Sequence, residues 1–420
     1  MMVSKKTINY FARKELNLNL QVVSSKQQTN FEWVYIISLL SYPLSSYISE
    51  FLGLGSNILS VVARAVTLFS VLAYAGFLIS NGLFRPVYIF YLFLFFWILY
   101  SGRIMYDTTH YAWTLGRPST DYILFAFILS FVCTIPFYIQ VKLPGIKLEN
   151  KIFFLLFILN LLGLYNNLSA DNLFMERLGG NERLNPITFG NLASYLLIIS
   201  FLKVIRFNNS IGVYLLLVIA ICMSLANLFI AASKSPIIFS LLSFVLMIIY
   251  NLRKNNLKAV LFLLSAMAIG VFIIIAIGLQ DIFLLTFLRF SEISNDNSSV
   301  ERFDQLRGGY NQFITNPLFG DFLEERVSKE YPHNLILEGF MATGIFGGSL
   351  FLVFFIGFIF VTFYNIFKSG LHCMPFLALS ALIVSIFSGG LSFSIDFWVS
   401  AAIMYAMFFT LRAQQRLNSP

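Results

Sequence analysis

Residues 295–348 read NDNSSVERFDQLRGGYNQFITNPLFGDFLEERVSKEYPHNLILEGFMATGIFGG. They form the long hydrophilic segment of a chain that otherwise consists mostly of apolar runs. The segment re-enters an apolar run directly after His333 and Asn334. A polar segment between two apolar runs of spanning length predicts a loop at a membrane surface. We therefore expect the rest of the chain to be the membrane scaffold that holds this loop.

The composition places the chain among membrane proteins. Of its 420 residues, 58% are hydrophobic and only 11% are charged, whereas a soluble domain carries about 25% charged residues. The net charge of +8 does not indicate a nucleic-acid partner, because the cations lie mostly in short loops between apolar runs. The three cysteines show no spacing typical of a metal site or a disulfide framework. These features predict an all-α polytopic membrane protein.

A helix needs about 20 mostly apolar residues to cross a bilayer, and the chain has about twelve such runs. The runs are 32–51, 57–80, 86–101, 122–140, 152–168, 187–203, 211–232, 236–252, 257–280, 335–364, 374–391 and 394–411. They predict a single transmembrane domain over 32–411, with a long loop at 281–334 between the ninth and tenth helices. The basic segment 1–31 lacks the apolar core of a signal peptide, so we expect it and residues 412–420 to be cytoplasmic tails.

Cytoplasmic loops are enriched in Lys and Arg, and with a cytoplasmic N-terminus most basic loops fall inside. Four outward segments nevertheless carry cations. These cations are Arg103 and Arg117; Arg177 and Arg183; Lys234; and Arg289, Arg302, Arg307, Arg326 and Lys329. Pairing with neighbouring acids is one explanation, and an anionic ligand at the outer surface is the other. Arg64, inside the second apolar run, either belongs to a functional site or extends to the outer headgroups.

The loop itself contains a predicted helix. Ser298 and Glu301 have the spacing of a capping box. Apolar residues then recur at helical spacing, and they are Val300, Phe303, Leu306, Tyr310, Phe313 and Ile314. We expect this helix to lie on the outer membrane surface or over the helix bundle, with that apolar face down. Asn334 is placed to cap the tenth helix, which puts His333 at the membrane edge.

Four segments together resemble the bacterial O-antigen polymerase and O-antigen ligase superfamily. The segments are ERLGGNERLNPITFGNLASYL at 176–196, AASKSPIIFSLL at 231–242, VERFDQLRGGYNQFITNPLFGD at 300–321 and YPHNLILEGFMATGIFGG at 331–348. They cover the second half of the chain, while the first half is similar only in topology. One difference is Ser233-Lys234, where the superfamily often has Ser-Arg. The lysine keeps the positive charge, but the bidentate hydrogen-bonding geometry of a guanidinium is lost.

The resemblance implies a glycosyltransferase C-type fold and an active site at the periplasmic face of the bacterial inner membrane. The implied donor is a glycan on undecaprenyl pyrophosphate, with no metal or other cofactor. A polymerase transfers that glycan to another lipid-linked repeat unit of O-antigen or capsule, and a ligase transfers it to lipid A–core. A chain-length regulator protein is an implied partner of a polymerase.

The residue chemistry agrees with such a transfer. A leaving pyrophosphate needs its negative charge stabilised, which Arg and Lys side chains do at a water-poor surface. An attacking sugar hydroxyl needs a base that is active near neutral pH, which favours histidine. We therefore expect His333 and Arg302 to be catalytic. The candidates for binding pyrophosphate are Arg177, Arg183, Lys234 and Arg307.

Other interpretations stay open at the level of sequence. His333 could instead be a structural residue at the start of the helix that forms a hydrogen bond to a loop carbonyl. Arg302 could instead form a salt bridge with Glu301 or Asp304. His110, Arg103 and Arg117 are further candidates for lining the same cavity. The ligase is the second candidate function. A flippase for the same lipid-linked glycan belongs to another class, as does a purely structural membrane protein.

Overall fold

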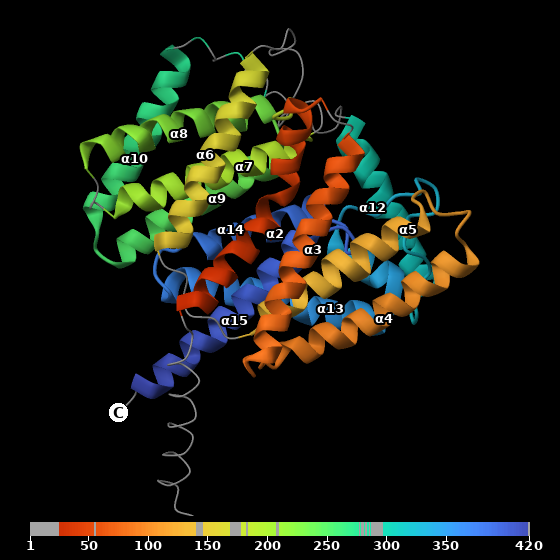
Figure 1. Ribbon diagram of the computed structural model, residues 1–420. Coiled ribbons are helices and arrows are strands. Elements are labelled where there is room, and N and C mark those ends of the chain that lie inside the picture. Colours follow the sequence, from red (N-terminus) through yellow and green to blue (C-terminus); the bar gives the residue numbers. More distant parts are fainter. Residues whose placement is uncertain are drawn as a thin grey trace, which may run out of the picture.

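The computed structural model describes residues 25–53, 56–139, 146–168, 178–181, 184–206, 210–276, 278, 281, 284, 286 and 297–418. These residues are almost entirely helical, and among them there is no strand beyond two isolated bridges (Figure 1). Nine helices in the described part are long and apolar enough to cross a membrane. The chain is thus an all-α, multi-pass membrane protein.

The first third begins with the paired helices α2 (Ser25–Phe51) and α3 (Ser56–Ser80). Helix α4 (Ile89–His110) follows, and then the short α5 (Ser119–Tyr122). The next span continues as a π-helix, η1 (Ile123–Phe131), and then as a 3₁₀-helix, η2 (Val132–Tyr138). Pro136 lies inside η2, and since proline has no backbone N–H it suits the end of a helical run.

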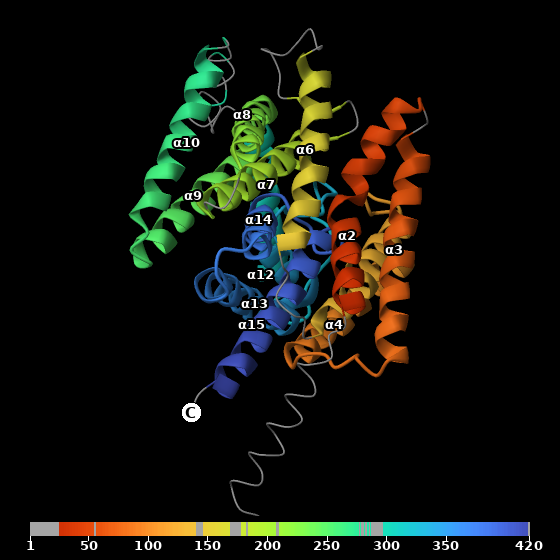
Figure 2. The same ribbon diagram turned by 60° about the vertical axis from the view of Figure 1, so that its left-hand side comes forward.

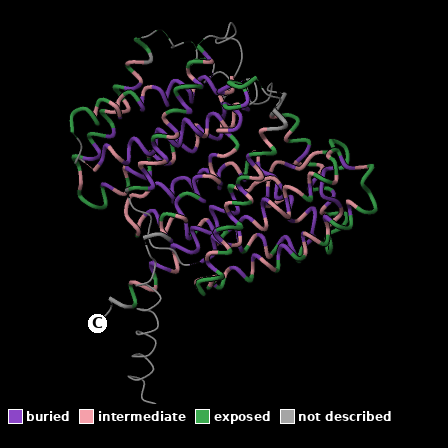
Figure 3. Tube along the Cα trace, in the orientation of Figure 1, coloured by how far each residue is buried: buried purple, intermediate pink, exposed green. Residues whose placement is uncertain are grey.

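The middle third consists of five helices. They are α6 (Ile146–Leu168), α7 (Pro186–Ile205), α8 (Ile211–Ala231), α9 (Lys234–Arg253) and α10 (Leu257–Ala276). Helix α10 lies beside α8 and α9 at the edge of the bundle in both views (Figure 2), whereas α7 is buried along most of its length (Figure 3).

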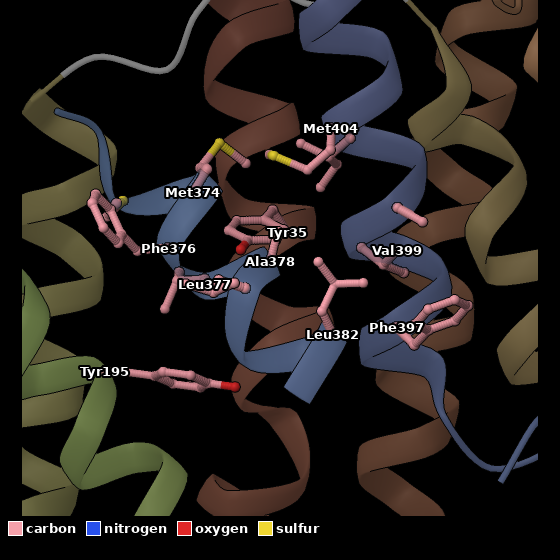
Figure 4. Packing of buried hydrophobic residues seen from close by; sticks show 14 of the residues in the cluster. Tyr35, Tyr195, Met374, Phe376, Leu377, Ala378, Leu382, Phe397, Val399 and Met404 are labelled. Atoms are coloured by element: carbon pink, nitrogen blue, oxygen red, sulfur yellow. The ribbon is translucent and has the colours of Figure 1, made fainter. Parts of the chain in front are cut away.

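The last third carries α12 (Asn297–Thr315), α13 (Leu335–Lys368), α14 (Cys373–Phe387) and α15 (Ile395–Asn418). Helices α14 and α15 pack against each other and against residues from other thirds, including Tyr35 of α2 and Tyr195 of α7 (Figure 4). The middle of the molecule is therefore built from segments distant in sequence.

The described parts of the predicted apolar runs fall mostly on helical segments. One of them gives a shorter apolar helix, Cys373–Phe387, and neither α2 nor α10 is among the nine long apolar helices of the described part. The twelve crossings and the cytoplasmic tails therefore stay predictions. The first tail falls largely outside the described residues, as does part of the predicted loop at 281–334.

Helix α12 confirms the predicted helix in the loop, but it does not place its apolar face against the bundle. Phe303, Tyr310 and Ile314 are exposed, whereas Gln305 and Gln312 are buried. A structural reason is visible at Gln312, whose amide group donates to the carbonyl of Glu324 and accepts from the N–H of Arg326. The polar face holds the following loop, so the apolar face is left pointing away. The Ser298 side chain lies outside the described part.

Helix α13 is broken at Gly344, which has φ +65° and ψ −162°. This backbone region is essentially restricted to glycine. At the break, the N–H of Ile345 donates to the carbonyl of Pro317 at 2.7 Å instead of to its own helix. A Cβ on Gly344 would lie 2.2 Å from the Leu318 carbonyl oxygen. The NPLFG turn, residues 316–320, thus packs directly against the interrupted backbone of α13.

Candidate functional site

His333 lies at the start of α13 in a strained backbone conformation. Its φ is +53°, which is uncommon for a residue with a side chain. The following residue, Asn334, accepts from the N–H of Leu337 at 3.0 Å, so it caps α13 as predicted. Asn334 also donates to the carbonyl of Ile386, which ties this turn to the end of α14. These two hydrogen bonds of Asn334 fix the turn that carries His333.

The imidazole of His333 packs edge-on against Tyr331, with the ring centroids 4.5 Å apart. Burial lowers the pKa of His333, and the nearby positive charge of Arg302 lowers it further. Its Nδ1 atom is buried, and within the described part of the chain it has no hydrogen-bond partner. A neutral histidine with an unpaired ring nitrogen is suited to take up a proton.

His333 and Arg302 line the same cavity, which has a volume of about 310 Å³. Its wall is contributed by α7, α12, α14, α15 and the turn before α13, so it lies where segments distant in sequence meet. Tyr331, Asn185 and Asp396 also line it. The structure therefore brings together the two residues expected to be catalytic.

Arg302 does not pair with the neighbouring acids of its own helix. Its guanidinium donates to the carbonyl of Phe387 at 3.1 Å, and no ion pair joins it to Glu301 or Asp304, both described and exposed. The local salt-bridge alternative for Arg302 is therefore wrong. One hydrogen bond at the end of α14 holds the side chain, which also lines the cavity.

Of the other predicted ligands for pyrophosphate, the two that the structure describes, Lys234 and Arg307, do not line this cavity. Lys234 donates to Ser299 at 3.0 Å and so links α9 to α12. Arg307 is exposed on α12. Arg177 and Arg183 lie outside the described residues. Pyrophosphate binding by these four residues stays a prediction.

Arg103 has a structural role that explains one outward cation. Its guanidinium donates to the carbonyls of Phe319, Gly320, Asp321 and Ala342, at 2.8 to 3.1 Å. It therefore clamps the NPLFG turn onto both α4 and α13. One side chain thus donates to four backbone acceptors.

Arg117 and two carboxyl groups complete this attachment. Arg117 pairs with Glu330 at 3.0 Å, and Asp107 accepts from the N–H of Leu323 at 2.9 Å. Glu324 accepts from the N–H of Gly116 and from the hydroxyl of Tyr122, and burial raises its pKa. Neither Arg103 nor Arg117 lines the cavity that holds His333, and the same is true of His110.

A second cavity of about 360 Å³ adjoins the first. Seven residues line both, and they are Asn185, Thr188, Asn191, Tyr195, Phe393, Ile395 and Asp396. Arg64 lines the second cavity. The two spaces therefore share a wall, made by the start of α7 and the start of α15.

Asp396 is the acidic side chain on that shared wall. It keeps an exposed surface although it lies in an apolar helix, because it opens onto the cavities. We did not single it out from the sequence. The available signal was an acidic residue at the start of the run 394–411, where an intramembrane charge indicates function.

No group of three or more His, Cys, Asp or Glu side chains is placed to hold a metal ion in the part of the chain that the structure describes.

Among known proteins, no family model matches the chain, and a search of curated proteins finds no match.

Proposed function

We propose that this protein is a glycosyltransferase that joins repeat units of O-antigen or capsule at the periplasmic face of the bacterial inner membrane. The donor is a glycan on undecaprenyl pyrophosphate, and the acceptor is the non-reducing end of another lipid-linked unit. The observation that carries the proposal is the convergence of His333 and Arg302 on one cavity. The two residues supply the two groups that the transfer needs.

In the proposed reaction, a hydroxyl oxygen of the acceptor sugar forms a bond to the anomeric carbon of the donor. The bond from that carbon to the pyrophosphate oxygen breaks, and the electron pair leaves with the pyrophosphate. The hydroxyl proton goes to the ring of His333, whose Nδ1 is unpaired within the described residues. Arg302 stabilises the charge that develops on the leaving group.

The electrostatics of the pair suit both roles. Arg302 lowers the pKa of His333 together with burial, so the imidazole is neutral at neutral pH and ready to accept a proton. A bound pyrophosphate would offset part of the Arg302 charge and raise the basicity of the imidazole. The donor would thereby prepare the base for its own transfer.

Complementation of a deletion strain tests this function. Cells that carry the wild-type chain should make long polysaccharide, while cells with His333→Ala should keep the protein in the membrane and make lipid A–core with at most one repeat unit. Bare core with accumulating lipid-linked polymer would instead indicate the ligase. Lipid-linked single units held at the cytoplasmic face would indicate a flippase and would exclude both transferase functions.

A further inference from the structure

The second cavity is lined by the polar face of α3. Ser60, Ala63, Arg64 and Thr67 share this lining at helical spacing. The neighbouring positions Val61, Val62, Val66 and Phe69 are 46 to 69% exposed and form the outward, apolar face. Arg64 therefore lies on the cavity side of the helix. This placement disfavours extension of its side chain to the lipid headgroups.

Arg64 is held in place by an aromatic ring, and the negative charge of Asp121 acts on it from beyond ion-pair distance. Its guanidinium stacks on Phe125, 4.3 Å from the ring centroid. No ion pair to Arg64 is formed among the described residues. A guanidinium fixed on an aromatic ring, with its charge facing a cavity, is preorganised to bind an anionic group.

The rest of the lining suits a saccharide. Hydroxyl groups come from Ser38, Ser41, Ser60, Thr67 and Ser130, and aromatic rings come from Tyr42, Phe125 and Phe393. Ser38, Thr67 and Ser130 already donate hydrogen bonds within the protein, so their oxygen atoms remain as acceptors for sugar hydroxyls. The Oδ1 atom of Asn191, on the wall shared by both cavities, is buried and has no partner within the described part.

We propose that the second cavity is the subsite for the acceptor glycan, and that Arg64 binds an anionic substituent of that glycan, a carboxylate or a phosphate. This inference rests on the proposed transferase function. It assigns the two reactants to two cavities, the donor pyrophosphate beside Arg302 and the acceptor beside Arg64. The shared wall with Asn191 and Asp396 is then where the acceptor hydroxyl meets the donor.

A binding measurement separates the subsite from the reaction. Mild acid releases the oligosaccharide of the lipid-linked unit from its pyrophosphate, and this free oligosaccharide can accept but cannot donate. Its affinity for the purified full chain in nanodiscs is measured by calorimetry. Arg64→Gln should weaken binding about tenfold or more, because a charge-assisted hydrogen bond is lost. His333→Ala should leave the affinity within about twofold.

Matched variants control for indirect effects. Arg85→Gln, an exposed position beyond the other end of α3, should bind like the wild type. Ser60→Phe should also weaken binding, because it fills the cavity without removing the guanidinium. Equal affinity of wild type, Arg64→Gln and Ser60→Phe would overturn the subsite.

The chemistry of the bound group is tested on the oligosaccharide. If Arg64 binds a carboxylate, reduction of the sugar carboxyl groups should abolish the difference between wild type and Arg64→Gln; if it binds a phosphate, phosphatase treatment should do so. A difference that survives both treatments would overturn the anionic substituent.

Transfer from the lipid-linked donor to the free oligosaccharide is measured on the same samples. Binding that depends on Arg64 without any transfer by the wild type would reject the proposed transferase but not the subsite. Transfer with an acceptor KM unchanged in Arg64→Gln would reject the subsite but not the transferase.

Discussion

The Nε atom of Arg103 donates a 2.8 Å hydrogen bond to the carbonyl oxygen of Ala342, which joins α4 to the start of α13 across 239 positions of the chain. The same guanidinium binds three further carbonyls in and after the NPLFG turn. The polar loop is thus fastened to the first third of the bundle at positions before and after the turn that carries His333.

Removal of this clamp should destabilise the loop. Arg103→Gln leaves several carbonyls without their charged donor, and we expect a loss of about 3 kcal/mol, which corresponds to a fall in Tm of about 3 °C in detergent. Limited proteolysis should then cut within 316–330. Arg307→Gln, at an exposed position of α12, is the matched control and should keep the wild-type Tm. An unchanged Tm in Arg103→Gln would show that the clamp adds nothing to stability.

The pH dependence of transfer should report the His333–Arg302 pair. The pKa of His333 is lowered by burial and by Arg302, so the wild-type kcat/KM should fall only at a pH below the ordinary titration range of a histidine. Arg302→Gln removes one lowering influence, and the fall should then begin at a higher pH. Arg302→Lys keeps the charge, so it should retain the wild-type pH profile at a reduced rate. Identical profiles for wild type and Arg302→Gln would contradict the coupling.

Asp396 offers a test at the wall between the cavities. Asp396→Asn keeps the shape of the side chain but removes the negative charge that can orient the acceptor hydroxyl, and kcat should fall about 100-fold. The free oligosaccharide should still bind. Asp304→Asn, an exposed acid on α12, should transfer at the wild-type rate. Full activity of Asp396→Asn would remove this carboxyl group from the reaction.

Gly344 should tolerate no side chain. An alanine there would combine a disfavoured backbone conformation with a clash against the Leu318 carbonyl, and we expect a loss of about 3 kcal/mol or more. The measurement is the Tm and the yield of folded protein in detergent. Gly212→Ala, in α8, meets nothing within 4 Å and should be neutral or slightly stabilising. Equal stability of the two variants would show that the break in α13 is not required.

The local features of this molecule could be predicted from the sequence. Asn185 caps α7 ahead of Pro186, and Asn334 caps α13, as the spacing of these residues indicates. The apolar runs predicted the helical segments because a membrane leaves few alternatives to a helix. The sequence also predicted that His333 and Arg302 belong to one site, from the chemistry of the loop and from the resemblance.

The remaining features depend on contacts between distant residues. Arg103 was one of several candidate ligands until its four carbonyl partners were visible, two hundred or more positions away. The inward face of α12 is set by Gln312, which binds a loop backbone that periodicity cannot place. Asp396 gains its significance from two cavities whose walls come from α3, α7, α12 and α15. No local sequence pattern predicts a cavity wall formed by helices that are distant in sequence.

The break in α13 also bears on bilayer thickness. An unbroken helix of 34 residues would be about 51 Å long, well beyond the roughly 30 Å of hydrocarbon. With the break, the part after Gly344 is about 36 Å long and can match the bilayer by tilting alone. The short part before Gly344 stays bound to α4 through Arg103. A thicker or thinner membrane would therefore change the angle at Gly344 while His333 keeps its place.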